Sequence, residues 1–116
     1  ANGTPGALLI SIHQNCLPGH PSVRGAQVFY NAVEPSRQLA EVVQQALNGT
    51  VNESAKTAKP IGDGVYLMSH TTCPAILVEC GFLSNWQEEA KLSTPDYQKK
   101  LCCVISASVA SFLASP

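Results

Sequence analysis

The sequence predicts an α/β fold, with a mixed, mostly parallel sheet and helices on both of its faces. Residues 75–78 form a continuous apolar run between Pro74 and Gly81, which is typical of a strand covered on both sides. Residues 36–48 and 95–113 instead carry apolar side chains at helical spacing. With 116 residues, the chain corresponds to one domain or part of one.

Composition excludes several classes of function. Charged residues make up 13% of the chain and the formal net charge is −1, which argues against nucleic-acid binding and against a polybasic membrane anchor. No apolar run approaches the roughly 18 residues that a membrane span requires. We therefore expect neither a nucleic-acid partner nor a membrane span.

The five cysteines follow no CxxC spacing of the kind found in zinc or redox sites. We expect free thiols, most of them buried.

Four strands are predicted, over residues 7–12, 26–30, 65–68 and 75–78. The first stops at His13, and a loop rich in Pro and Gly follows it over residues 14–25. Residues 69–73 are too few for a parallel crossover, so the last two strands are expected to be antiparallel neighbours or unpaired.

Three helices are predicted from their end signals. The first begins at Pro35 and Ser36 and closes at Asn48 and Gly49. A short helix over residues 86–92 has Asn85 as its N-cap and Glu88 in position to complete a capping box. The last helix starts with Thr94 as N-cap and Pro95 as its first residue.

Two strands end in side chains that can do chemistry, His13 and Glu79. If both strand ends face one crevice, the imidazole can ligate zinc and the carboxylate can move a proton between water and a leaving amine. The simpler interpretations are a hydrogen-bonded loop histidine and an edge-exposed or salt-bridged glutamate. His20 and His70 are expected in loops, either solvated or near substrate.

The sequence resembles the zinc-dependent N-acetylmuramoyl-L-alanine amidases, bacterial cell-wall hydrolases with a mixed α/β fold. The resemblance runs in order along nearly the whole chain and is most specific in its last motif. It comprises LISIHQN (residues 9–15), GAQVFY (25–30), VYLM (65–68) and PAILVECGFLSN (74–85). The branch that trims spore-cortex peptidoglycan is the most similar, so a role in sporulation is expected.

This resemblance implies a zinc ion held by His, Glu and His, with a C-terminal Glu as general base. His13 matches the last ligand and Glu79 matches the base. The implied reaction is hydrolysis of the amide between N-acetylmuramic acid and L-alanine in peptidoglycan, by a secreted or cell-wall-associated bacterial enzyme.

The other two zinc ligands have no counterpart in the sequence. We therefore expect residues 1–116 to be the C-terminal part of a single amidase catalytic domain that lacks its N-terminal strands. A zinc site needs three protein ligands, so this piece alone is expected to be inactive. A sheet without those strands has an uncovered edge, which predicts self-association or pairing with the missing N-terminal segment.

Two alternatives stay open. One is a non-catalytic peptidoglycan-binding module of the same fold. The other is thiol chemistry at Cys80, which is disfavoured because Cys80 should point away from Glu79 along a strand.

Overall fold

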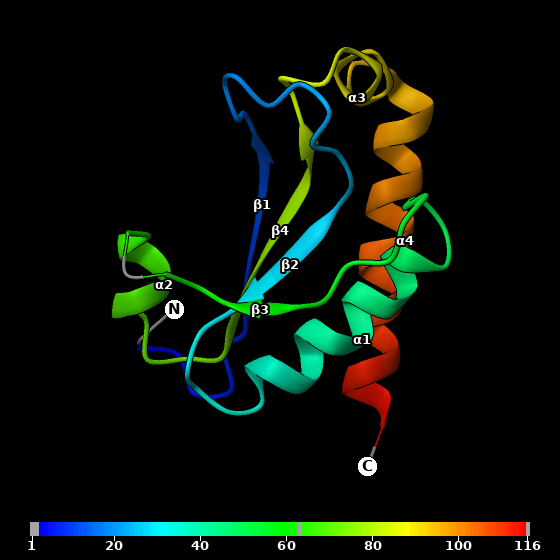
Figure 1. Ribbon diagram of the computed structural model, residues 1–116. Helices are drawn as coiled ribbons and strands as arrows, with labels where there is room; N and C mark the ends of the chain where they lie inside the picture. The colour runs from blue at the N-terminus through cyan, green and yellow to red at the C-terminus, as the bar shows by residue number, and fades with distance from the viewer. Residues whose placement is uncertain (1–2, 63, 116) are drawn as a thin grey trace.

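The computed structural model describes residues 3–62 and 64–115 of the chain. Figure 1 shows the arrangement of its helices and strands. In chain order these are β1 (Leu9–Asn15), β2 (Gln27–Tyr30), α1 (Ser36–Asn48), β3 (Lys59–Pro60), α2 (Tyr66–His70), β4 (Ala75–Phe82), α3 (Trp86–Leu92) and α4 (Pro95–Ala114).

The strands form a mixed sheet in the order β1-β4-β2-β3. The β1/β4 and β2/β3 pairs are parallel, whereas β2 runs antiparallel to β4. Helices α1 and α4 cover one face, and the short α2 lies on the other side of the sheet (Figure 1). The predicted α/β fold, with a mixed, mostly parallel sheet and helices on both faces, is confirmed.

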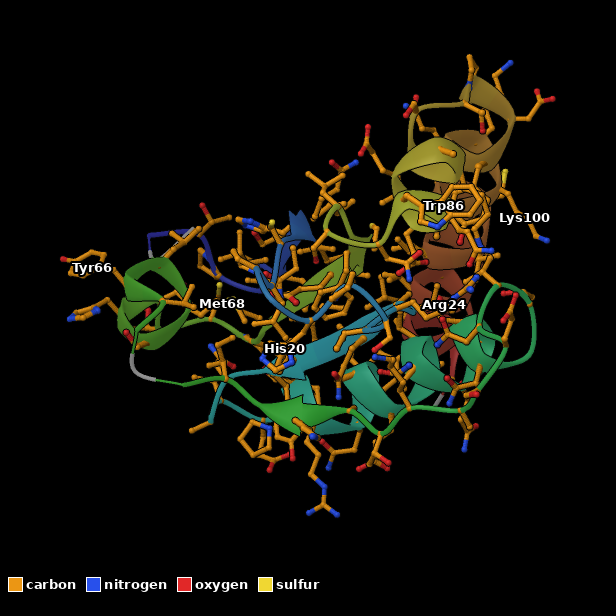
Figure 2. The ribbon with its side chains drawn as sticks, turned by 45° about the horizontal axis from the view of Figure 1, so that its top comes forward. His20, Arg24, Tyr66, Met68, Trp86 and Lys100 are labelled. Atoms are coloured by element: carbon orange, nitrogen blue, oxygen red, sulfur yellow. The ribbon has the colours of Figure 1, made fainter. Side chains whose placement is uncertain are left out.

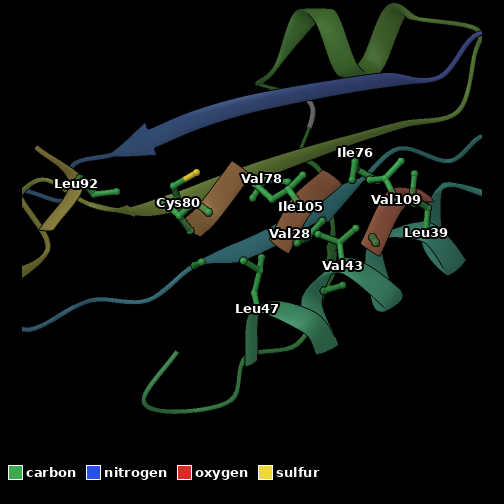
Figure 3. Close-up of a cluster of buried hydrophobic side chains, with 14 residues drawn as sticks. Val28, Leu39, Val43, Leu47, Ile76, Val78, Cys80, Leu92, Ile105 and Val109 are labelled. Atoms are coloured by element: carbon green, nitrogen blue, oxygen red, sulfur yellow. The ribbon is translucent and has the colours of Figure 1, made fainter. Parts of the chain in front are cut away.

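The main core lies between the sheet and helices α1 and α4 (Figure 3). It forms because the apolar stripes of the two helices face the side chains that β2 and β4 direct toward them. Its fully buried members include Val28, Leu39, Val43, Leu47, Ile76 and Val78. A smaller cluster on the opposite face joins Met68 of α2 to Ala75 and Leu77 of β4.

The helix ends largely follow the sequence signals. Helix α1 spans Ser36–Asn48, as predicted. The Asn85 side chain caps α3, and the Thr94 hydroxyl accepts from the Tyr97 amide at the start of α4, 3.4 Å away. Of the helices in residues 3–62 and 64–115, none is both long and apolar enough to cross a membrane.

The strand predicted over residues 65–68 is wrong, because this segment contributes to helix α2. Met68 is buried against the sheet while Tyr66 and Leu67 are 73% and 55% exposed, so only one side of a helical turn contacts the core. A short apolar run cannot by itself separate a strand from a helical turn. The expected antiparallel or unpaired relation to β4 therefore does not arise. The two-residue strand β3 is not among the predicted strands.

Strand β1 runs three residues beyond the predicted end at Ile12 and therefore includes His13. It is an edge strand of the sheet. Ile12 is 56% exposed, and it borders a groove of about 500 Å³ that Leu92, Leu101 and Ile105 also line. Apolar surface is thus open on the α4 side of the sheet next to β1.

At the opposite edge of the sheet, a side chain occupies backbone groups that β3 leaves unpaired. The Gln44 amide of α1 accepts the Val28 N–H at 2.8 Å and donates to the Ala26 carbonyl at 3.1 Å. It thereby occupies backbone groups of β2 that a neighbouring strand would otherwise use. β3 pairs with the end of β2, at Phe29 and Tyr30.

The five cysteines are free, as predicted, but most are not buried. Cys73 and Cys80 are buried, whereas Cys16, Cys102 and Cys103 are exposed. The adjacent pair lies on α4, whose buried stripe passes through Leu101 and Ile105 and leaves Cys102 and Cys103 outside it.

Candidate active site

His13 and Glu79 are register partners on the parallel strands β1 and β4. Partners in parallel register direct their side chains to the same face of a sheet. Two and four residues earlier, Leu77 and Leu9 pack with Met68 on that face. The structure therefore brings His13 and Glu79 together at the carboxyl end of two adjacent strands, where open α/β sheets bind ligands.

Glu79 is accessible although the strand around it is not. In β4, all of which the structure describes, Glu79 alone is not buried. Its Oε2 accepts a hydrogen bond from Asn15 Nδ2 at 2.6 Å. The ion pairs found within residues 3–62 and 64–115 join Arg24 to Glu53 and Arg37 to Glu41, so neither engages Glu79.

His13 is exposed, and one of its ring nitrogens has a partner. Nε2 lies 2.8 Å from the Ser11 hydroxyl, on the same face of β1. This contact orients the ring. It also leaves Nδ1 as the nitrogen that can bind a metal ion or another group.

The register of β1 and β4 shifts directly after the His13–Glu79 pair. Asn15 is opposite Phe82, so two steps along β1 match three along β4. Such an extra residue bends a strand and redirects its side chains. Here the shift accompanies the contact between Asn15 and Glu79.

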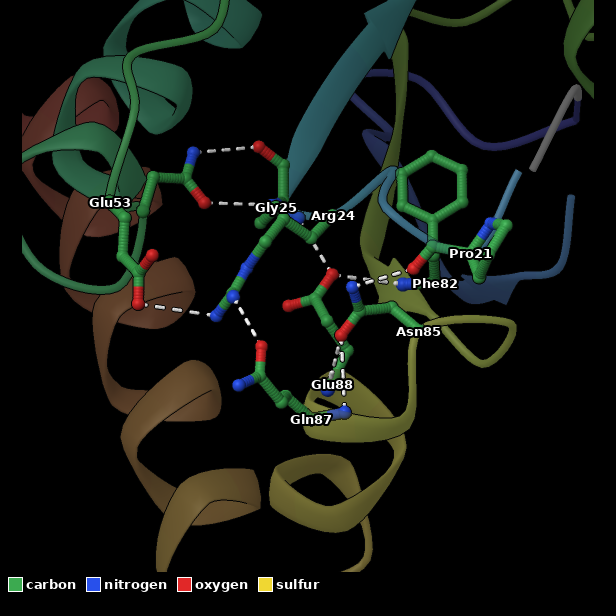
Figure 4. Close-up of polar contacts among 10 residues, drawn as sticks. Pro21, Arg24, Gly25, Glu53, Phe82, Asn85, Gln87 and Glu88 are labelled. Carbon is green, nitrogen blue, oxygen red and sulfur yellow. Dashed lines mark hydrogen bonds and ion pairs between the residues drawn. The ribbon is translucent and has the colours of Figure 1, made fainter.

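The loop after β1 is held against the start of α3 (Figure 4). The buried Glu88 carboxylate accepts the Gly25 N–H at 2.6 Å and the Phe82 N–H at 3.1 Å. Asn85 Nδ2 donates to the Pro21 carbonyl at 2.8 Å. These contacts hold the loop, the end of β4 and the start of β2 in one arrangement.

The predicted capping box at α3 forms only in part. The Asn85 side chain accepts from the Gln87 and Glu88 amides, as an N-cap should. Glu88 does not complete the box, because its carboxylate bonds to Gly25 and Phe82, and the Asn85 amide donates to the Phe82 carbonyl.

Cys80 points to the opposite face from Glu79, as predicted, and belongs to the main core. Burial, and secondarily the nearby Cys102 thiol, raises the pKa of the Cys80 thiol from 9.0 to about 11. A thiol with so high a pKa is a poor nucleophile near neutral pH. This argues against thiol chemistry at Cys80.

His20 and His70 do not lie on β1 or β4 with the His13–Glu79 pair. His20 is exposed in the loop after β1, and His70 ends α2, where its ring stacks on Tyr66 at 3.8 Å between ring centroids. Figure 2 labels His20 and Tyr66 on separate parts of the molecule. Within the described residues, no three His, Cys, Asp or Glu side chains are grouped so as to hold a metal ion.

A family model described as N-acetylmuramoyl-L-alanine amidase matches residues 1–111. The chain belongs to this amidase family. Among curated relatives, the germination-specific N-acetylmuramoyl-L-alanine amidase of Bacillus subtilis is 34% identical over 104 residues, covering 90% of this chain and 44% of its own. The Bacillus subtilis amidase LytC is 29% identical over 111 residues, covering 90% of this chain and 21% of its own.

Solved amidase structures have the same fold. The CwlD amidase from Clostridioides difficile, in complex with the GerS lipoprotein, superposes with a TM-score of 0.88 at 30% identity, covering 97% of this chain and 57% of that one. An N-acetylmuramoyl-L-alanine amidase from Clostridium difficile 630 gives 0.84 at 32% identity, covering 98% and 61%. The chain thus spans less than two thirds of each of these amidases, from 21% of LytC to 61% of the Clostridium difficile 630 enzyme.

Ser11 and Asn15 belong to the amidase-like motif LISIHQN, but no role was predicted for either residue. Both lie two residues from His13, and a period of two was the signal that could have placed them on its face. The contacts of Glu88 had no such signal, since Gly25 is 63 residues away in sequence.

Proposed function

We propose that this chain is part of an enzyme that hydrolyses the amide bond between N-acetylmuramic acid and L-alanine in peptidoglycan, with Glu79 as general base. The supporting observation is the side-by-side placement of His13 and Glu79 at the ends of two parallel strands, in a chain of the amidase family. A bacterial protein with this substrate acts outside the membrane, secreted or associated with the cell wall. The similarity to a germination-specific amidase supports a spore-cortex substrate.

Glu79 suits the proton transfers of this reaction. Its carboxylate is accessible, and Asn15 holds one oxygen, so Oε1 is left to accept a proton from water. The water oxygen then bonds to the lactyl carbonyl carbon, and the carbon–nitrogen bond breaks as Glu79 returns the proton to the nitrogen of L-alanine. The products are a muramic-acid carboxylate and a stem peptide with a free amino end.

The described residues do not fit a zinc site by themselves, because no group of three His, Cys, Asp or Glu side chains that could hold a metal ion is found among them. We propose that His13 is one ligand of a catalytic zinc and that the other two come from residues outside this chain. Residues 1–116 are then the C-terminal part of a catalytic domain and inactive alone. The share of the solved amidases that the chain covers is consistent with this proposal.

The edge at β1 supports a matching proposal about assembly. The missing N-terminal segment pairs with β1 and covers Ile12 and the adjoining groove, and without it the chain self-associates through the same surface. Light scattering tests the second part. A monodisperse monomer at high concentration would contradict it.

The test of function uses the complete protein that carries this chain, with purified peptidoglycan and added zinc. Mass spectrometry should detect stem peptides with a free L-alanine amino group, and Glu79→Gln should abolish their release. Glu89→Gln, an exposed change on α3, is the matched control. Undiminished release by Glu79→Gln would refute the assigned role.

A separate measurement addresses the isolated chain. Zinc titration should give no tight one-to-one binding and no amidase activity. Tight binding together with activity would show that the chain carries a complete site.

The second candidate is a peptidoglycan-binding module. It is favoured by the lack of a three-ligand group among the residues that the structure describes. Muropeptide binding that is unaffected by a chelator, without cleavage by the complete protein, would support it.

A further inference from the structure

The amide of Asn15 lies between a fixed point of the backbone and the proposed general base. Its Nδ2 donates to Glu79 Oε2 at 2.6 Å, and its Oδ1 accepts the Cys16 N–H at 2.8 Å. We infer that Asn15 is a positioning residue for the proposed hydrolysis: it selects Oε2 as the anchored oxygen and leaves Oε1 to exchange a proton with water. This inference rests on the proposed function of Glu79.

Asn15 is itself well held. The Cys16 N–H can donate only to the carbonyl side of the amide, so the amino side must face Glu79. The main chain is also anchored, because the Asn15 carbonyl accepts the Leu83 N–H at 2.6 Å. This second bond joins β1 to β4 just beyond the register shift, so the donor keeps a fixed place relative to the strand that carries Glu79.

Glu79 needs such a partner because, in the part of the chain that the structure describes, no other hydrogen bond or ion pair of its carboxylate is found. A glutamate has three rotatable side-chain bonds, and its free rotamers would place the carboxylate at different distances from a reacting water. The ion pairs within the described residues involve Glu53 and Glu41 instead. A general base must lie within hydrogen-bond reach of the proton that it removes, so one anchored oxygen favours the productive geometry.

The chemical type of the donor also suits the reaction. Glu79 alternates between a carboxylate and a carboxylic acid during the proposed cycle. An amide N–H donates to an oxygen in either state, whereas an arginine or lysine in the same place would oppose proton uptake through its charge. Asn15 therefore fixes the position of the base without adding a charge beside it.

The spectroscopic arm of the test uses this chain, labelled with ¹⁵N. In Glu79→Ala, the side-chain amide resonance of Asn15 should move upfield, as expected for loss of a hydrogen bond to a carboxylate. The same resonance should stay in place in Glu89→Ala, where the exposed carboxylate is on α3. An Asn15 side-chain amide with the same chemical shift in wild type and Glu79→Ala would overturn the inference.

The kinetic arm uses the complete protein. Asn15→Asp keeps an oxygen to accept the Cys16 N–H but replaces the donor toward Glu79 with a second acceptor. We expect kcat to fall about tenfold to a hundredfold, the range of one charge-assisted hydrogen bond, while KM changes little. Asn15→Gln, which keeps an amide donor, should retain more of kcat than Asn15→Asp.

The outcomes separate the two proposals. An inactive wild-type complete protein means that the proposed function fails and the inference with it. An active wild type whose Asn15→Asp variant keeps full kcat means that the inference alone fails. An equal loss in the Asp and Gln variants would also count against it, since the donor would then not be the feature that matters.

Discussion

Glu88 and Gly25, which are 63 residues apart in sequence, are joined by a hydrogen bond of 2.6 Å from the Gly25 N–H to the Glu88 carboxylate. The same oxygen accepts the Phe82 N–H, so one buried carboxylate links α3, the loop before β2 and the end of β4. Arg24 strengthens this link by donating to Gln87 at 2.7 Å. Side chains of α3 therefore fix the positions of the two segments that flank the proposed site, the loop before β2 and the end of β4.

Glu88→Ala should lower the free energy of unfolding by about 2–4 kcal/mol, because two backbone N–H groups lose their acceptor. Glu88→Gln keeps a carbonyl oxygen in place and should lose less. Urea denaturation followed by circular dichroism measures both. An alanine variant as stable as wild type would mean that water or another group replaces the carboxylate.

Gln44→Leu should also destabilise the fold, by about 1–3 kcal/mol, because the Val28 N–H loses its acceptor in a buried position. The matched control is Gln45→Leu, which changes an exposed neighbour on the same helix. Thermal unfolding of the two variants compares them directly. Equal melting temperatures would show that the amide contributes nothing beyond its volume.

Leu39→Ala should cost about 2–5 kcal/mol, since Leu39 is fully buried between α1 and the sheet and its truncation leaves a cavity. Leu113→Ala, at a position 65% exposed near the end of α4, should change stability by no more than about 0.5 kcal/mol. Denaturant midpoints measure both changes. A small effect at Leu39 would indicate that the core closes around the missing side chain.

Cys80 should make stability depend on pH in the alkaline range. Its pKa is raised to about 11 in the folded chain, from 9.0. As pH rises above 9, the unfolded chain releases this proton first, so the free energy of unfolding falls until the folded thiol also ionises. Cys80→Ala should therefore lose less stability between about pH 8 and about pH 10 than wild type.

Urea denaturation under reducing conditions checks this, with Cys103→Ala as the control at an exposed thiol. Burial, and to a smaller extent Glu88 and Cys80, raises the pKa of Tyr97, so Tyr97 adds to the slope in each of these proteins, and removal of Cys80 lowers its contribution in the same direction as the prediction. An identical slope in wild type and Cys80→Ala would contradict the prediction.

Local signals in the sequence were sufficient for much of the fold. Asn85 and Thr94 identified the starts of α3 and α4, because capping chemistry is decided by a few adjacent residues. The apolar run at residues 75–78 identified the central strand. Met68 shows the limit of such signals, since four apolar residues fit a strand or a helical turn equally well until the contact with the sheet is known.

In the candidate site, too, some residues could be predicted from local sequence signals and others could not. His13 and Glu79 could be predicted because each follows an apolar strand in a recognisable motif. The contact between Asn15 and Glu79 could not, because it accompanies a register shift between β1 and β4 that no local pattern encodes. Glu88 was assigned to a local capping box, but its carboxylate instead accepts hydrogen bonds from the Gly25 and Phe82 N–H groups, which lie outside the box.

The Gln44 amide has a consequence for the size of any assembly. The Gln44 side chain occupies backbone groups of β2, and Pro60 in β3 has no N–H to donate. A further strand can therefore be added most readily at the β1 edge of the sheet. When two copies pair through β1 about a twofold axis, neither copy keeps a free β1 edge, so growth stops. Association of this chain through β1 should therefore end at a dimer rather than continue into fibres.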